Sequence, residues 1–147
     1  MNYRVYKTIA VIIILFSFAK CAKRGRPTGG EKDEMAPILI SASPSQESIH
    51  FNEKKIKIYF DEYVKLKDVN KQLIVSPPHK NTLDITPVGT ASKVLILRIK
   101  DTLKENTTYT INFGNSVQDN NEGNTLKSFK YVFSTGSFID SLKLSGD

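Results

Sequence analysis

The 147-residue sequence has one cysteine, no tryptophan and two histidines. A single cysteine excludes an internal disulfide framework and any cysteine-rich metal site. The two histidines, His50 and His79, lie on separate segments without a clustered partner, so we expect no metal site built on them. The G-x-S-x-G elbow, the phosphate-binding loop and the H-E-x-x-H motif are also missing. These absences predict a protein that is not an enzyme.

Acidic residues are missing from the first 26 positions. Six basic residues lie there: Arg4, Lys7, Lys20, Lys23, Arg24 and Arg26. The rest of the chain carries 15 basic and 15 acidic residues and is neutral. Because a nucleic-acid-binding domain needs a basic stripe on its folded surface, the net charge of +6 does not indicate one, and we expect no nucleic-acid partner.

No apolar run is long enough to span a bilayer comfortably. The longest, IAVIIILFSFA at residues 9–19, has 11 residues, whereas a spanning helix needs about 20. It follows two basic residues, which is the pattern of a secretory signal peptide. The alternative interpretations are an uncleaved signal anchor in the inner membrane and a signal that is cleaved at a different position, with Cys21 then playing no part.

Cys21 stands directly behind this run, an arrangement that resembles the lipobox of bacterial lipoproteins. The resemblance implies that signal peptide 1–20 is removed and that Cys21 becomes a lipidated N-terminus, with diacylglyceryl and N-acyl groups. We expect no other cofactor. Lys20 stands where that family has a small residue, and Phe18 where an aliphatic residue is usual. Residues 21–36 are rich in Gly, Pro and charge and predict a flexible tether.

Residues 37–136 predict an all-β fold. Short apolar stretches, separated by Pro, Gly and Asn, indicate strands within residues 37–44, 48–51, 55–64, 71–78, 83–88, 93–100, 107–114 and 129–136. In the sixth stretch, Leu95, Leu97 and Ile99 share a purely apolar face, which predicts the core side. One helical turn is expected near residues 66–71. Seven or eight strands at such intervals predict an Ig-like antiparallel Greek-key β-sandwich.

Two local motifs sharpen this prediction. Leu103 and Tyr109 indicate a tyrosine corner, in which the hydroxyl bonds back to the upstream backbone. VQDNNEGN, at residues 117–124, predicts a turn. Its Asp119, Asn121 and Glu122 fail the calcium-loop spacing, because Gly123 is one place early and Lys130 occupies the twelfth position.

Four motifs together resemble the SbsA-type bacterial Ig-like domain. They comprise Phe60, Glu62 and Val64; Leu103, Thr108 and Tyr109; Asp119, Gly123 and Asn124; and Phe133, Thr135 and Gly136. The whole layout resembles Bacteroidota lipoproteins that begin with one such domain. The resemblance implies a non-catalytic spacer or protein-interaction module whose partners are membrane lipid and another envelope protein. Ala22 after the cysteine resembles outer-membrane sorting, and we expect the periplasmic face.

Three further features remain as expectations. Residues 137–147 read as an edge strand or the start of a truncated further segment. DTL and DSL, at residues 101–103 and 140–142, resemble a short O-glycosylation acceptor motif, with Thr102 and Ser141 as acceptors. The alternative function is a carbohydrate-binding or enzyme-accessory module that uses exposed aromatics, for which the candidates are Tyr59, Tyr63 and Tyr131. Core or strand-pairing use of these tyrosines is the favoured interpretation. Asp61 and Glu62 are neighbours on a strand and face opposite sides, so they do not form a catalytic pair.

Overall fold

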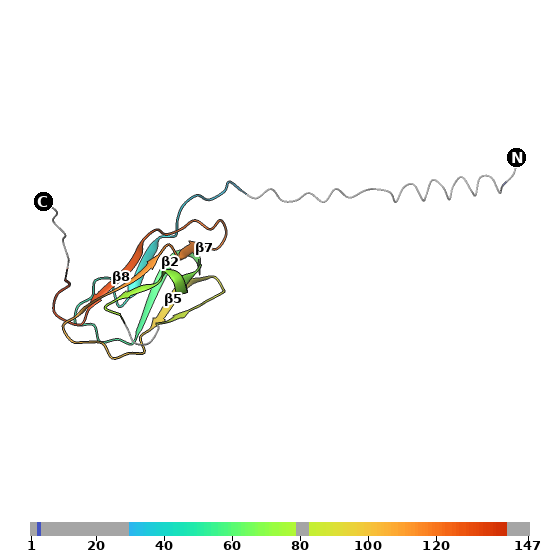
Figure 1. The fold of residues 1–147 in the computed structure, drawn as a ribbon. Coiled ribbons are helices and arrows are strands. Elements are labelled where there is room, and N and C mark those ends of the chain that lie inside the picture. The colour runs from blue at the N-terminus through green and yellow to red at the C-terminus, as the bar shows by residue number, and fades with distance from the viewer. Residues whose placement is uncertain (1–2, 4–29, 79–82, 141–147) are drawn as a thin grey trace. The chain divides into compact units, whose positions relative to one another are not determined.

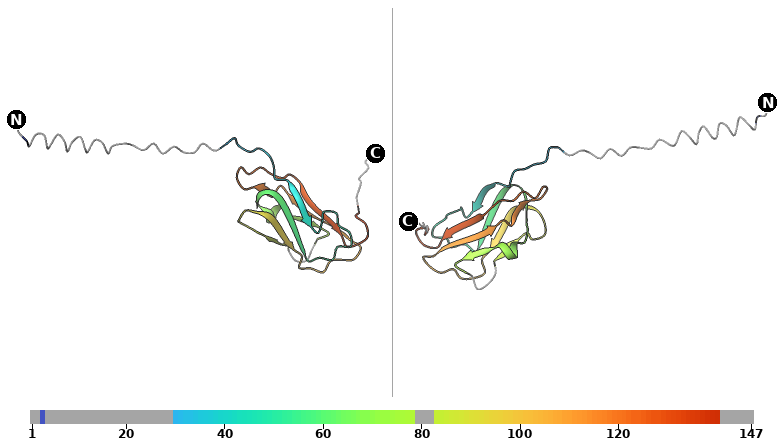
Figure 2. Two further views of the ribbon diagram at one scale, coloured as in Figure 1. Left: turned by 180° about the vertical axis from the view of Figure 1, so that it is seen from behind. Right: turned by 45° about the horizontal axis from the view of Figure 1, so that its top comes forward.

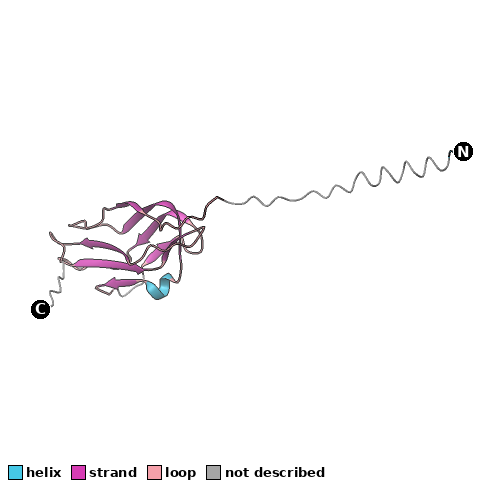
Figure 3. Cartoon of the chain, turned by 90° about the horizontal axis from the view of Figure 1, so that it is seen from above, coloured by secondary structure: helices cyan, strands magenta, loops and turns pink. Residues whose placement is uncertain are grey.

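The computed structural model describes residue 3 and residues 30–78 and 83–140, and its strands form two antiparallel sheets (Figure 1). The first sheet has the order β1 (Leu39–Ser43), β2 (Lys55–Leu66), β5 (Ser92–Arg98), β4 (Asp84–Thr86), with β7 (Val117–Asp119) paired to the end of β2. The second has the order β3 (Ile74–Ser76), β6 (Thr108–Gly114), β8 (Phe129–Ser134). A helical turn, α2 (Val69–Gln72), precedes β3 and is the cyan element of Figure 3.

This strand order is that of a constant-type immunoglobulin sandwich, in which four strands of one sheet pack on three of the other. β7 is an addition to that plan. The predicted Ig-like β-sandwich is therefore confirmed.

The core lies between β2 and β5 on one side and the aromatic residues of β6 and β8 on the other. Alternate residues of β2 and β5 point inward, and in register Ile58 pairs with Leu95 and Ile56 with Leu97; all four are fully buried. Full burial of such a side chain stabilises the fold by about 1.5–3 kcal/mol. The predicted core face of β5 is confirmed, since Leu95, Leu97 and Ile99 are at most 4% exposed.

Two strand predictions were wrong. Residues 48–51 form no regular strand, and Ser48 makes an isolated parallel bridge to Phe133. Ile49 is 47% exposed whereas Phe51 is 6% exposed, because His50, at φ 52°, turns the backbone between them. Residues 117–119 were expected to begin a turn but form β7 first, a strand too short to show an alternating pattern. Residues 137–140 form no strand, and residues 141–147 lie outside the described part of the chain.

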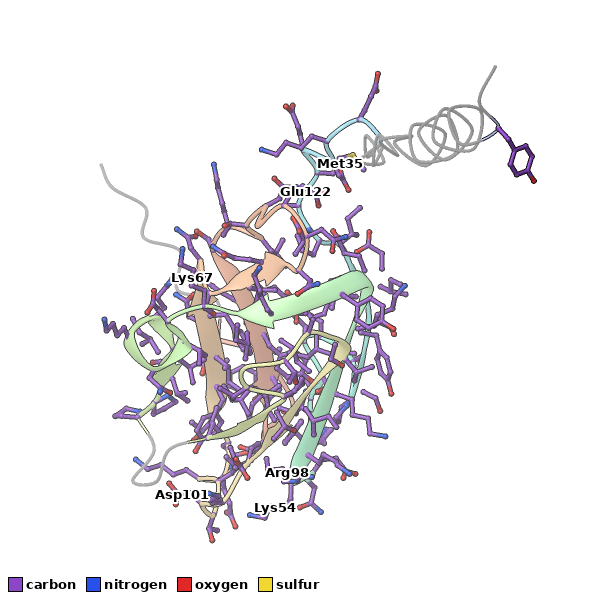
Figure 4. All side chains as sticks on the ribbon, turned by 90° about the vertical axis from the view of Figure 1, so that its right-hand side faces the viewer. Met35, Lys54, Lys67, Arg98, Asp101 and Glu122 are labelled. Atoms are coloured by element: carbon purple, nitrogen blue, oxygen red, sulfur yellow. The ribbon has the colours of Figure 1, made fainter. Side chains whose placement is uncertain are left out.

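The strand directions define two ends of the sandwich. The proximal end holds Leu39, Leu66, Gly114 and Phe129, and the distal end holds Ser43, Lys55, Arg98, Thr108 and Ser134. Figure 4 shows Met35 and Glu122 at the proximal end and Lys54, Arg98 and Asp101 at the distal end. The Asn124 side-chain amide donates to the carbonyl of Asp33 at 2.9 Å, and the Asp140 N–H donates to Thr108 Oγ1 at 2.9 Å. The folded part therefore begins at the proximal end and finishes at the distal end.

Candidate functional site

A cavity of about 300 Å³ opens at the distal end. It lies among residues 50–54, residues 102–105 and Thr135, which come from three separate loops. Phe51 and Leu103 supply apolar lining, and the polar lining combines His50, Lys54 and Lys104 with Glu53 and Glu105. This mixture of charges and hydrogen-bonding groups suits a polar ligand. It contains no nucleophile held by a base.

The tyrosine corner holds one wall of this cavity. Tyr109, on β6, is 3% exposed, and its hydroxyl accepts a hydrogen bond from the Lys104 N–H at 2.9 Å. Thr135 Oγ1 donates to the carbonyl of Lys104 at 2.7 Å and accepts from the Thr107 N–H at 3.0 Å. A Cβ on Gly136 would lie 3.1 Å from the Asn106 Cα, so a larger residue there would force the backbone at Asn106 to shift by a few tenths of an ångström. The wall is therefore built before any ligand arrives.

The proximal end is organised by the predicted turn. The Asp119 carboxylate, 1% exposed, accepts hydrogen bonds from the backbone N–H groups of Glu122, Gly123 and Asn124 at 2.7, 3.1 and 2.6 Å. Gly123 adopts φ 82°, which favours glycine. Burial alone would raise the pKa of Asp119, but these hydrogen bonds outweigh it and lower the pKa below its ordinary value. The predicted turn is confirmed, and the Asp119 carboxylate accepts its hydrogen bonds from the backbone of that turn.

Acidic side chains gather around this turn. Burial, and then the negative charges of Asp119, Asp61, Asp33 and Glu122, raise the pKa of Glu62. Asp61 instead ties the residue before β1 to β2, because its carboxylate accepts from the Ile38 N–H at 2.8 Å. Within residues 30–78 and 83–140, no three His, Cys, Asp or Glu side chains are placed to hold a metal ion.

The three tyrosines considered for carbohydrate binding differ in their exposure to solvent. Tyr63 is 58% exposed, with Lys93 Nζ 5.6 Å from its ring centroid, and Tyr59 is half-buried on the same strand. For Tyr131 the structure confirms the core use that the sequence favoured over an exposed position. Tyr131 is fully buried, and its hydroxyl donates to the carbonyl of Pro44 at 2.8 Å. It points into the core because its β8 neighbours Lys130 and Val132 take the outward positions.

The remaining predicted site residues are placed only in part. Thr102 is exposed and lines the distal cavity. Cys21, His79 and Ser141 lie outside the described residues. Sequence analysis missed the joint position of His50, Lys54 and Lys104, because loop residues from separate segments carry no spacing signal. In the described part of the chain, no helix is long and apolar enough to cross a membrane.

Comparisons with known proteins concern mainly the sandwich. The model of a family described as the bacterial Ig-like domain matches residues 33–135. The chain is similar to the crystal structure of PcoC, a methionine-rich copper resistance protein from Escherichia coli: 17% identity and a TM-score of 0.46, over 67% of this chain and 97% of that one. It is also similar to an L,D-transpeptidase from Mycobacterium smegmatis: 11% identity and a TM-score of 0.40, over 69% of this chain and 41% of that one. No curated protein matches.

Proposed function

This chain belongs to the bacterial Ig-like domain family, and on that premise we propose that it is a non-catalytic cell-envelope protein whose sandwich acts as a spacer or protein-interaction module. The observation that carries the proposal is the placement of the chain's entry and exit at opposite ends of the sandwich. β2 alone has 12 residues, and at about 3.3 Å per residue it extends roughly 40 Å. A domain whose chain enters at one end and leaves at the other adds its full length to the protein that contains it.

The proposal includes a lipid anchor on Cys21. Diacylglyceryl and N-acyl chains would hold the N-terminus in the outer membrane, on its periplasmic face, as in the SbsA-type lipoproteins of Bacteroidota that the sequence resembles. More than one acyl chain is needed for stable anchoring. Support comes from the position of the only cysteine, directly behind the apolar run. The partner at the free end is another envelope protein.

The test is an intact mass of membrane-extracted protein together with [³H]palmitate labelling. Wild type is expected to start at Cys21 with added acyl chains, and Cys21→Ser is expected to lose both the label and the processing. Lys20→Ala is the matched variant, because it places a small residue before the cysteine and is expected to raise the processed fraction. An unprocessed and unlabelled wild-type chain would contradict the anchor.

A second candidate function is carbohydrate binding, which the distal cavity and the exposed ring of Tyr63 favour. The two surfaces are separable by substitution. Loss of binding to immobilised polysaccharide in His50→Ala would assign the ligand to the cavity, and loss in Tyr59→Ala or Tyr63→Ala would assign it to the outer face of β2. Retention by wild type no greater than by a bare resin would reject this function.

A further inference from the structure

Residues 46–51 and β8 form a contact that we name the terminal clamp. The two segments run parallel, as the bridge between Ser48 and Phe133 shows. Four backbone hydrogen bonds join residues 46–51 to β8 and to Gly136, two residues beyond its end: Glu47 N–H to Val132 O at 2.8 Å, Ser134 N–H to Ser48 O at 2.8 Å, Phe51 N–H to Ser134 O at 2.9 Å, and His50 N–H to Gly136 O at 2.8 Å. The clamp therefore ties the start of the sandwich directly to its last strand.

Side chains reinforce the same contact. The Tyr131 hydroxyl donates to the carbonyl of Pro44 at 2.8 Å, and Gln46 Nε2 donates to the carbonyl of Lys130 at 2.9 Å. The rings of Phe51 and Phe133 lie 4.0 Å apart, centroid to centroid. Figure 2 shows the start of the sandwich in cyan beside its last strand in red in both views.

The direction of the two segments decides how they bear a load. β1 and residues 46–51 both run from the proximal to the distal end, and so does β8. Tension on the folded chain pulls its N-terminal part beyond the proximal end and its C-terminal part beyond the distal end. The two segments of the clamp are then drawn in opposite directions along their own length. This is shear, and it loads all the cross-strand hydrogen bonds together.

We propose that the terminal clamp makes this domain resist tension along its N-to-C axis, a property that deepens the proposed spacer function and depends on it for its biological meaning. Load passes from residues 46–51 straight into β8, so the core between the sheets is bypassed. The outer strand pairs obey the same geometry. β1 is antiparallel to β2 and β8 is antiparallel to β6, so both terminal strands slide along their neighbours under load rather than peel from them.

The first experiment compares two pulling geometries in single-molecule force spectroscopy. The full chain carries Cys21→Ser and two cysteine handles. Handles at Lys32→Cys and Asp140→Cys load the clamp in shear, whereas Lys32→Cys and Lys127→Cys pull both segments from the proximal end and open it one bond at a time. We expect the unfolding force in shear to exceed the peeling force by at least about twofold, because forced unfolding follows the unfolding rate of the loaded contact. Equal forces in the two geometries would overturn the proposal.

The second experiment uses a matched pair of substitutions in the shear geometry. Tyr131→Phe removes the hydroxyl that reaches Pro44, inside the clamp, and Tyr109→Phe removes the hydroxyl at Lys104, outside it. Both tyrosines are at most 3% exposed, so both changes are expected to cost a similar equilibrium stability. The unfolding force is expected to drop in Tyr131→Phe and to stay near wild type in Tyr109→Phe. An equal drop in both variants would mean that force reports global stability, and the clamp would be rejected.

These measurements are independent of the anchor. Failure of palmitate labelling with a high shear force would remove the lipoprotein proposal and leave the clamp. A normal lipid anchor with no difference between the pulling geometries would reject the clamp and leave the lipoprotein proposal.

Discussion

The Asp119 carboxylate and the backbone N–H of Asn124 are joined by a hydrogen bond of 2.6 Å. The side chain of the same Asn124 reaches Asp33 at 2.9 Å, where the folded part of the chain begins. One buried carboxylate therefore fixes the turn after β7, and that turn positions the segment leading into β1. The spacer proposal depends on this connection, because it sets where the sandwich is attached.

Asp119→Ala is expected to lower the free energy of unfolding by about 2–4 kcal/mol, since it leaves three backbone donors without their charged acceptor. Urea denaturation measures the loss. Glu122→Ala is the control, because the turn uses only the backbone N–H of Glu122. A difference of less than about 0.5 kcal/mol between the two variants would show that the carboxylate does not organise the turn.

The lowered pKa of Asp119 predicts an acid-sensitive fold. A carboxyl whose pKa is lower in the folded state contributes stability above its unfolded pKa and loses it as the pH falls through the folded pKa. Thermal unfolding between pH 6 and pH 2 is therefore expected to show a steeper decline for wild type than for Asp119→Asn, which lacks the titrating group. Parallel curves would contradict the assignment.

The raised pKa of Tyr131 predicts that the folded state loses stability at alkaline pH. Burial raises its pKa to about 12, and the hydroxyl donates its proton to the carbonyl of Pro44 at 2.8 Å. The folded state therefore keeps the proton that the unfolded chain loses near pH 10, and the stability contributed by Tyr131 is lost as the pH rises from about 10 to 12. Tyr131→Phe is expected to be less stable at neutral pH and to have a shallower alkaline slope. Unfolding monitored by circular dichroism measures both; an unchanged slope would argue against a buried, protonated Tyr131.

Gly114 and Gly89 form a matched pair for backbone conformation. Both adopt positive φ, 57° and 81°, but a Cβ on Gly114 would lie 3.2 Å from Gln72 Oε1, whereas a Cβ on Gly89 meets open space. Each alanine substitution is expected to cost about 1 kcal/mol for the left-handed backbone. Gly114→Ala is expected to cost more, because Gln72 Oε1 also accepts the Asn115 N–H. A smaller loss for Gly114→Ala than for Gly89→Ala would refute the role of this contact.

The acceptor motifs predict O-linked glycan on Thr102 and Ser141. Thr102 is exposed, so its hydroxyl is accessible to a transferase. Protein purified from its native host is expected to carry added hexose mass that disappears in Thr102→Ala/Ser141→Ala and persists in Thr90→Ala, an exposed threonine without the motif. A wild-type mass without hexose would reject the modification.

The parts of this protein that the sequence determined by itself are those in which the pattern and the contact are local. The shared apolar face of Leu95, Leu97 and Ile99 identified a core side, because neighbouring residues of a strand point to opposite sides. Tyr109 and Asp119 were readable because each bonds to backbone within five residues along the chain. The position of Cys21 raised the anchor hypothesis, which labelling and mass measurements test.

Only the tertiary structure decided the features that join distant segments. Tyr131 occupies a core position, and its hydroxyl finds an acceptor 87 residues away at Pro44, a pairing that no local pattern encodes. The left-handed backbone of His50 turned an apparent strand into one side of the terminal clamp. The distal cavity likewise exists only because three loops meet there. Such contacts depend on strand order and chain direction, which the packing of the two sheets sets and the alternation of residues along one strand does not.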